Sequence, residues 1–250
     1  WIKLKSMNLG PSTGICIVLG TGSGDTHSNL YFHNIVANNC DGSMGVYVQK
    51  TAGTQSNITF NGLTVSNSSG TGMQVDSCGT NFLVTNSMFA NNGAGGNQDG
   101  LFIGANDAPC TNWVVSNSVA YGNGVGGSGS GFDTSNNGGY SNSGGVFDSV
   151  LAYNNGNTQI SSSSSSSFDN VTIRNSIVYG SNDWADIVLY ENITAYLYNN
   201  TCGGGDASNP CYAFSAVDGT PCGQLKNNIA YGTYSTAATY SGCVTASNNL

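Results

Sequence analysis

Short runs of alternating apolar and polar residues recur along the chain, and each ends at an asparagine or a serine. In the run that ends at Asn117, the apolar residues Trp113 and Val115 lie four and two positions before it. Such alternation predicts a β-strand with one buried face. The recurring end positions are spaced by 21 to 32 residues, which indicates a solenoid of stacked repeats. They are Ser6, Asn34, Asn61, Asn86, Asn117, Ser149, Asn175, Asn199, Asn227 and Asn248.

Each repeat contains two further strand patterns. An apolar residue follows two positions after the corner, often with a tyrosine two positions later, as in Val119 and Tyr121. A glycine then opens a third alternating run, as in residues 100–103. Three strands in about 25 residues predict an all-β parallel β-helix of about nine to ten coils in a single domain, residues 1–250. The second apolar stack is predicted at Val36, Leu63, Met88, Val119, Leu151, Ile177 and Ile229.

The corner asparagines suit a sharp bend, because asparagine tolerates the left-handed backbone conformation. Their amides both donate and accept hydrogen bonds, so identical amides about 4.8 Å apart can bond along the axis. The sequence therefore predicts an asparagine ladder at one corner. At Asn61 the preceding apolar residues Ile58 and Phe60 are one position out of step, which we interpret as a local bulge.

These features support a resemblance. Residues 112–123, followed by Gly131, Phe132 and Asp133, resemble the coils of right-handed parallel β-helix proteins of the pectate-lyase type, which also carry an asparagine ladder. The resemblance extends over nearly the whole chain and implies the fold, whereas many unrelated activities share this architecture. It also implies that a binding cleft would lie over the third strand of each coil.

Both ends of the repeat series lack an obvious polar or helical cap. Ile2 and Val244 occupy equivalent places in the first and last repeats. Uncapped strand edges invite pairing with another chain, so either flanking residues are missing or copies associate end to end.

The charge balance excludes several partners. The chain has 5 Lys+Arg and 13 Asp+Glu residues, a formal net charge of −8. Nucleic acid is an improbable partner because there is no basic patch to neutralise phosphates. The same shortage disfavours an acidic polysaccharide as substrate. No apolar stretch approaches the length that spans a membrane.

The eight cysteines form four local pairs in the predicted stacking: Cys16–Cys40, Cys78–Cys110, Cys202–Cys211 and Cys222–Cys243. Disulfides indicate an oxidising, extracellular location, secreted or at the cell surface.

Asn57, Asn67, Asn170 and Asn192 begin matches to the N-glycosylation pattern. A further match at Asn199 falls on a corner residue and is interpreted as accidental. The serine run 161–167 is compatible with a strand of small residues, a bulge or an O-glycosylated patch.

Catalytic motifs are incomplete. Around Asp133 only residues 131–133 match the calcium-binding run of family-nine pectate lyases, with Gly129 and Ser130 in place of carboxylates. We therefore expect no metal or cofactor, with calcium left open as an alternative that no complete motif supports. Asp76 and Asp133 lie two coils apart, about 10 Å, too far to share a calcium ion. If the protein is an enzyme, the candidate residues are Asp99, Asp133 and Arg174, although Arg174 is expected on a different sheet. Candidate glycan-facing residues are Tyr47, Gln74, Asp76, Phe102 and Asp133.

Two functions remain open at this point. The favoured hypothesis is a secreted, glycosylated scaffold that acts as a fibre or surface protein without catalysis. The alternative is a pectate-lyase-like carbohydrate-active enzyme, either a polysaccharide lyase or a glycoside hydrolase, or a glycan-binding module. In both, carbohydrate is the expected partner, either covalently attached or bound.

Overall fold

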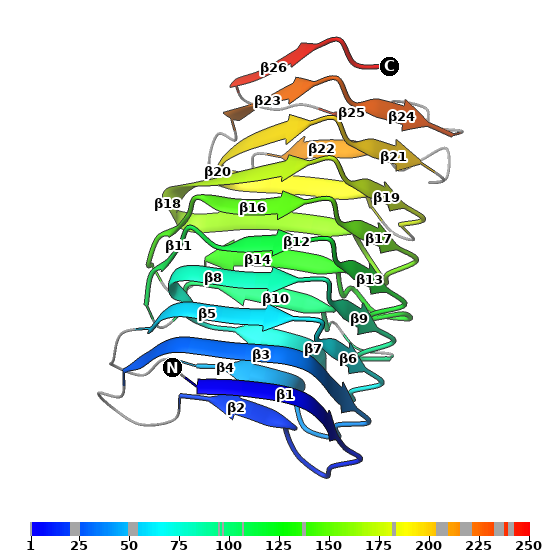
Figure 1. The fold of residues 1–250 in the computed structure, drawn as a ribbon. Coiled ribbons are helices and arrows are strands. Elements are labelled where there is room, and N and C mark those ends of the chain that lie inside the picture. Colours follow the sequence, from blue (N-terminus) through cyan, green and yellow to red (C-terminus); the bar gives the residue numbers. More distant parts are fainter. Residues whose placement is uncertain are drawn as a thin grey trace.

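The computed structural model is a column of stacked coils that rises from β1 at one end to β26 at the other (Figure 1). It describes residues 2–20, 26–49, 55–94, 96, 98–106, 108–136, 139–181, 184–203, 210–215, 222–232, 238–239 and 243–250. The side chains of residues 164–168, 191, 215, 222, 238–239 and 243 are outside this description. All regular elements in the described chain are strands, and all pairings between them are parallel. No helix among the described residues could cross a membrane.

The first sheet stacks ten strands in the described chain, each paired with the strand one coil away. They are β1 (Ile2–Leu9), β3 (His27–Asn38), β5 (Gln55–Asn61), β8 (Gly79–Thr85), β12 (Val114–Ser116), β16 (Gly145–Asp148), β18 (Ile160–Arg174), β20 (Ile187–Tyr198), β23 (Cys222–Lys226) and β26 (Cys243–Ser247), with the short β11 (Cys110–Thr111) and β15 (Asn142–Ser143) beside them.

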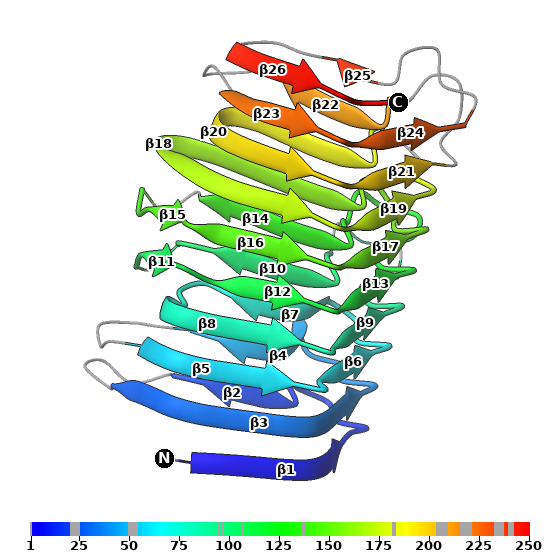
Figure 2. The ribbon, with the colours of Figure 1, turned by 45° about the horizontal axis from the view of Figure 1, so that its top comes forward.

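Two more sheets complete the coil, and Figure 2 shows the second one as a separate column of short arrows. The second sheet contains the last parts of β1 and β3, followed by β6 (Thr64–Ser66), β9 (Met88–Ala90), β13 (Val119–Tyr121), β17 (Leu151–Tyr153), β19 (Ile177–Tyr179), β21 (Thr201–Gly203) and β24 (Ile229–Tyr231). The third contains β2 (Ile17–Leu19), β4 (Met44–Val48), β7 (Thr71–Val75), β10 (Leu101–Gly104), β14 (Phe132–Asn136), the first parts of β18 and β20, β22 (Tyr212–Ser215) and β25 (Ala238–Thr239).

The parallel β-solenoid confirms the predicted fold class, with a correction to its size. About seven coils have a neighbouring strand on both sides in all three sheets. The coils at the two ends do not, because their strands are paired on one side only or are incompletely paired. The prediction of nine to ten coils is therefore slightly too high. The predicted right-handed sense stays a prediction.

The core is a set of columns that run along the axis. Phe32, Phe60 and Phe82 occupy successive coils of the first sheet, and the rings of Phe32 and Phe60 stack at 4.5 Å. Inward positions of the first sheet are the predicted ones, two and four residues before the corner. Burying such side chains provides the main favourable free energy of the fold, about 1.5–3 kcal/mol for each large apolar residue.

The predicted second apolar stack is wrong by one residue. Leu63 is buried, but Val119 and Leu151 are half-buried and Ile177 is 48% exposed, so this column faces outward. The inward residues of the second sheet lie one and three positions after the corner, for example Phe89 and Ala120. The tyrosines also face outward, and the rings of Tyr121, Tyr153 and Tyr179 stack on one another at 5.1 Å.

The alternation of inward and outward side chains reverses at the corner, because the corner residue adopts the left-handed conformation. Asn117 has φ 48°, and the next residue, Ser118, points inward and is buried. In the coil of Asn61 this conformation belongs to Gly62 (φ 74°), so Asn61 pairs with His33 and Thr85 inside the sheet. The predicted bulge at Ile58 and Phe60 is therefore absent, and the corner of that coil is Gly62.

The asparagine ladder is present, but its buried part lies beside the predicted column. The corner residues Asn86 and Asn117 are exposed. Buried amides follow the second strand at Asn92, Asn123 and Asn155, where each side-chain oxygen accepts a backbone N–H of the coil before at 3.1 Å and neighbouring amides bond to one another. A second ladder follows the first-sheet corner at Asn200 and Asn228, which are buried, and ends at the exposed Asn249.

Three disulfides are present in the described chain, and they are pairs expected from the sequence. Cys16–Cys40 and Cys78–Cys110 join neighbouring coils, and Cys202–Cys211 closes a loop within one coil. Cys222 and Cys243 are backbone partners in β23 and β26, but their side chains are not described. A bridge between these two therefore stays a prediction.

Candidate acid–base site on the third sheet

The outward face of the third sheet is built from columns of side chains in register. One column places Tyr47, Gln74, Phe102, Asp133 and Ser161 on successive coils. Because the strands are parallel and one coil apart, neighbours in a column are about 4.8 Å apart. The column beside it carries Thr71, the first residue of β7, and Asp99, Ser130 and Thr158, which lie just before β10, β14 and β18. Backbone hydrogen bonds link residues 72 to 99, 100 to 130 and 131 to 158.

This register brings Asp99 and Asp133 together through two serines. The backbone N–H of Ser130 donates to Asp99 Oδ1 at 2.7 Å. The hydroxyl of Ser161 donates to Asp133 Oδ1, and its oxygen lies 3.3 Å from the Ser130 hydroxyl. Ser130 in turn lies 2.8 Å from the hydroxyl of Thr158. The two carboxyl groups therefore lie in one cluster of hydroxyls.

Both carboxyl groups resist ionisation. Burial raises the pKa of Asp133 to about 6, although the hydroxyl of Ser161 and the backbone of Thr134 lower it in part. Burial also raises the pKa of Asp99 well above its usual value, and the negative charge of Asp133 raises it further. The two groups titrate as a pair, in which the first to ionise opposes the second. Because the charge of Asp133 raises the pKa of Asp99, Asp133 ionises first and Asp99 keeps its proton to higher pH.

A third carboxyl group on the same face, that of Asp76, is in a different environment. The oxygens of Asp76 accept hydrogen bonds from the Tyr47 hydroxyl at 2.6 Å, the Gln74 amide at 2.8 Å and the Asn106 amide at 3.0 Å. Tyr47, Gln74 and Asp76, three predicted glycan-facing residues, therefore bind one another. This cluster supports the sheet surface, and its groups are largely satisfied within the protein.

The structure separates Arg174 from the acidic pair. Arg174 lies at the end of β18 on the outer face of the first sheet, where its guanidinium forms an ion pair with Asp148 at 2.8 Å. It has no place in a site built on Asp99 and Asp133. Phe102 does belong there, because it is the coil neighbour of Asp133 and is half-buried, with part of its surface at solvent.

Among the described residues, one buried group consists of residue types that can ligate a metal ion. Its members are Asp186, Cys202 and Cys211. The two cysteines are joined to each other, so they have no thiolates to offer, and we assign no metal to this group. Asp76 and Asp133, two coils apart in the third sheet, belong to separate hydrogen-bonded clusters.

The glycosylation candidates differ in exposure. Asn57, Asn67 and Asn170 are exposed, and Asn192 is half-buried. Asn57 and Asn67 adopt the left-handed conformation and donate to Asn29 and Asn38 of the neighbouring coil at 3.2 and 3.0 Å. Glycosylation at these positions stays a prediction.

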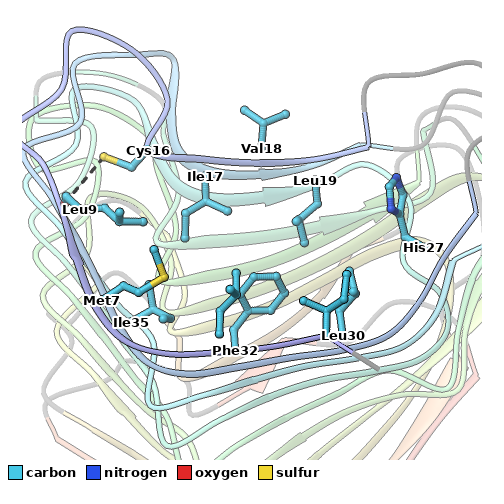
Figure 3. A pocket seen from close by; sticks show the side chains of 12 residues that line it. Met7, Leu9, Cys16, Ile17, Val18, Leu19, His27, Leu30, Phe32 and Ile35 are labelled. Carbon is cyan, nitrogen blue, oxygen red and sulfur yellow. Dashed lines mark hydrogen bonds between the residues drawn. The ribbon is translucent and has the colours of Figure 1, made fainter.

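The apolar interior is accessible at the β1 end. A hollow of about 440 Å³ lies between β1, β2 and β3, and Figure 3 shows Phe32, Ile17 and Leu19 directed into it. Its wall also includes Leu9 and Cys16, whose sulfur is joined to that of Cys40. Ile2 and Leu4 of β1 also line it and are 58% and 39% exposed.

Sequence reasoning missed Ser130, Thr158 and Ser161, which connect the two carboxyl groups. Ser161 opens the serine run, whose first four residues are a regular strand paired with β14 and β20. The sequence did contain a signal for Ser161, because a run of polar residues stands where the third strand of that coil is expected. The partner of each serine depends on the register between coils, which the repeat spacing alone does not give.

The chain shares its fold with solved parallel β-helix proteins. The A-module of the Azotobacter vinelandii mannuronan C-5 epimerase AlgE4 matches with a TM-score of 0.65 at 15% identity, over 94% of this chain and 82% of that one. The A-module of the Azotobacter vinelandii epimerase AlgE6 matches with a TM-score of 0.59 at 15% identity, over 99% and 88%. Pectate lyase Pel9A matches with a TM-score of 0.54 at 18% identity, over 90% of this chain and 54% of that one.

These likenesses confirm the resemblance to pectate-lyase-like β-helix proteins at the level of the fold. No protein-family model matches the chain. No curated protein matches it by sequence.

Proposed function

We propose that the protein is a carbohydrate-active enzyme that hydrolyses an uncharged glycan on the outer face of the third sheet. The observation that carries the proposal is the pair Asp99 and Asp133, two half-buried carboxyl groups with raised pKa values in one hydroxyl cluster. Glycoside hydrolases use two carboxyl groups, one protonated and one ionised. The fold shared with an epimerase and a lyase named for polysaccharides supports this class of ligand.

The roles follow from the electrostatics. Asp99 is the general acid, because both burial and the charge of Asp133 favour its protonated form. It gives its proton to the glycosidic oxygen as the bond from that oxygen to the sugar carbon breaks. Asp133 is the general base, which takes a proton from the water whose oxygen forms the new bond to that carbon. The ring of Phe102 offers an apolar surface beside Asp133 against which a sugar can pack.

A lyase or epimerase reaction on an acidic glycan suits this face less well. Proton abstraction next to a uronate needs a base and a cation that neutralises the carboxylate. Asp76, Asp99 and Asp133 are the charged residues that we place on the described part of the third-sheet face, and all three are acidic. An uncharged substrate avoids the repulsion between these groups and a uronate.

The test is a degradation assay with matched variants. The protein is incubated with neutral glycans (β-glucan, xylan, mannan, galactan) and with polygalacturonate and alginate, with and without calcium. We expect new reducing ends from a neutral glycan, lost in Asp133→Asn and Asp99→Asn and retained in Asp76→Asn. Unsaturated products from a uronate would show a lyase and contradict the proposal, as would failure to cleave any glycan.

The scaffold function is a second candidate, supported by the apolar hollow at the β1 end. Apolar surface of this kind is buried when another chain covers it, and the free edge of β1 can pair with a strand. End-to-end self-association is then expected at micromolar concentration and should be reduced by Leu4→Lys. Light scattering that shows monomers for both proteins would remove this candidate. Secretion, which the three disulfides support, is common to both functions.

A further inference from the structure

A polar groove of about 470 Å³ crosses the outer face of the first sheet, well away from the third-sheet site. It lies over the ends of β18, β20 and β23 and the corners that follow them. Its lining contains two cations, one tyrosine, one glutamine and three corner asparagines. They are Arg174, Lys226, Tyr198, Gln224, Asn175, Asn199 and Asn227.

The corner amides in this groove share one orientation. Asn227 Nδ2 donates to Asn199 Oδ1 at 3.2 Å, and Asn199 Nδ2 donates to Asn175 Oδ1 at 3.4 Å. Asn175 Nδ2 donates to Asp148 Oδ1 at 2.9 Å. A carboxylate only accepts hydrogen bonds, so Asp148 fixes the direction of the whole row. Each amide nitrogen carries a second hydrogen, and the corner residues are exposed. The row therefore presents N–H donors at the spacing of the coils.

Two cations flank the row. Arg174, Tyr198 and Lys226 are register partners on three successive coils, which places the cations two coils, about 10 Å, apart. Arg174 directs Nε and Nη2 to Asp148 Oδ2. Lys226 has no ion-pair partner among the residues described. The Tyr198 hydroxyl donates to Gln224 at 3.1 Å, which holds the ring between the cations.

The charges of the protein are divided between its faces. Lys3, Lys5, Arg174 and Lys226, which are the described lysines and arginines, all project from the outer face of the first sheet. The same face carries one of the described carboxylates, Asp148, which is paired with Arg174. The third-sheet face carries Asp76, Asp99 and Asp133. The charged side chains named here therefore favour a negatively charged ligand on the first sheet over the third.

We propose that this groove binds a strand of an anionic polysaccharide that runs along the solenoid axis. Arg174 and Lys226 pair with anionic groups two coils apart, the second N–H groups of Asn175, Asn199 and Asn227 donate to ring and hydroxyl oxygens, and Tyr198 packs against a sugar ring between them. The negative groups can be carboxylates or sulfates, because cations and N–H donors recognise both. This proposal is independent of hydrolysis at Asp99 and Asp133.

The test uses protein made without N-glycosylation, because Asn199 begins an acceptor motif. Binding is measured by calorimetry at low salt with polygalacturonate oligomers, heparin fragments, dextran and polyglutamate. We expect one or both anionic glycans to bind and dextran not to bind. Lys226→Gln should weaken binding about fivefold, as for a surface ion pair. Asn199→Gly, which keeps the left-handed backbone (φ 56°), should weaken it about threefold.

The matched control is Lys5→Gln, a cation on the same sheet face near the opposite end, which should bind within about twofold of the parent. Asp133→Asn should bind the anionic glycans like the parent. Binding in the groove is therefore tested independently of hydrolysis, and either proposal can fail without the other. The ratio of polygalacturonate to heparin affinity distinguishes carboxylate from sulfate. The proposal is overturned if neither glycan binds, if Lys226→Gln binds as well as the parent, or if polyglutamate binds as tightly as the glycans.

Discussion

Asp76 and Asp133 lie on the same face of the third sheet, yet their environments differ. Asp76 accepts hydrogen bonds from Tyr47, Gln74 and Asn106, so its negative charge is compensated by three donors. Asp133 receives a side-chain hydrogen bond from Ser161 and lies near a second carboxyl group, that of Asp99. The fold that carries both residues is the same, and the difference lies in the number of donors.

This difference shows how a regular solenoid can produce a reactive group without special secondary structure. Each coil presents an outward side chain at the same place, so the neighbours above and below decide its chemistry. Where amides and a phenol surround a carboxylate, it supports the surface. Where small hydroxyls and another carboxylate surround it, ionisation is costly and the pKa rises. Perturbed carboxyl pairs are typical of catalytic sites.

The largest expected effect is on activity. Asp133→Asn should lower glycan hydrolysis by about 100-fold or more, the usual contribution of a general base. Asp76→Asn should lower it by less than about threefold, because Asp76 is engaged by its own neighbours. Initial rates of reducing-end release measure both. Equal losses of hydrolytic activity in the two variants would contradict the different roles assigned to Asp133 and Asp76.

The next effect is on stability, and the two sites should differ in sign. Asp76→Ala leaves the Tyr47 hydroxyl and two amides without their acceptor, and should lower the free energy of unfolding by about 2 kcal/mol. Asp133→Asn removes a charge that burial disfavours, and should raise this free energy slightly at neutral pH. Urea denaturation at pH 7 measures both. A decrease for both variants would show that Asp133 is also a satisfied structural carboxylate.

The third effect is the pH dependence of stability. The pKa of Asp133 is about 6 in the folded protein and near 3.8 in an unfolded chain. Its folded-state pKa is raised, so its contribution to stability is fully present below pH 4 and is lost as the pH rises to about 6. Because the group is only partly enclosed, we expect a loss of about 1–2 kcal/mol.

This contribution is obtained by comparing the unfolding free energies of the parent and Asp133→Asn at pH 4, 5, 6 and 7. The difference between them should grow over this window and then level off. The same comparison for Asp76→Asn supplies the control. Parallel curves for parent and Asp133→Asn would contradict the raised pKa.

The smallest effect concerns Ser161. Its hydroxyl lowers the pKa of Asp133, so Ser161→Ala should raise that pKa and move the acidic limb of the activity profile to higher pH by up to about one unit. Ser163→Ala, two residues further along the same strand, is the matched control and should leave the profile in place. Coincident profiles for all three proteins would exclude Ser161 from tuning the site.

The sequence could predict the solenoid because local features define the repeat. Asparagine or serine marks most corners, and apolar residues two and four positions before them are buried. It also predicted three cysteine pairs that the structure contains, two between neighbouring coils and one, Cys202–Cys211, within a single loop. The prediction failed directly after the corner: the left-handed residue reverses the alternation, so Ser118 points inward and Val119 outward. It failed again at Asn61, because Gly62 can take the corner conformation as readily as asparagine.

The sequence by itself thus determined a parallel β-solenoid with disulfides and few charges, since periodicity, corner residues and composition are local properties. It also named Asp99, Asp133 and Asp76 as candidates. The sequence also predicted that Arg174 lies on a different sheet from Asp133. Only the tertiary structure decided that Asp99 and Asp133 share one cluster and that Asp76 is bound by Tyr47 and Gln74. Those relations depend on which residues of coils 24 to 32 positions apart become neighbours, and that register is set by the packing of the whole column.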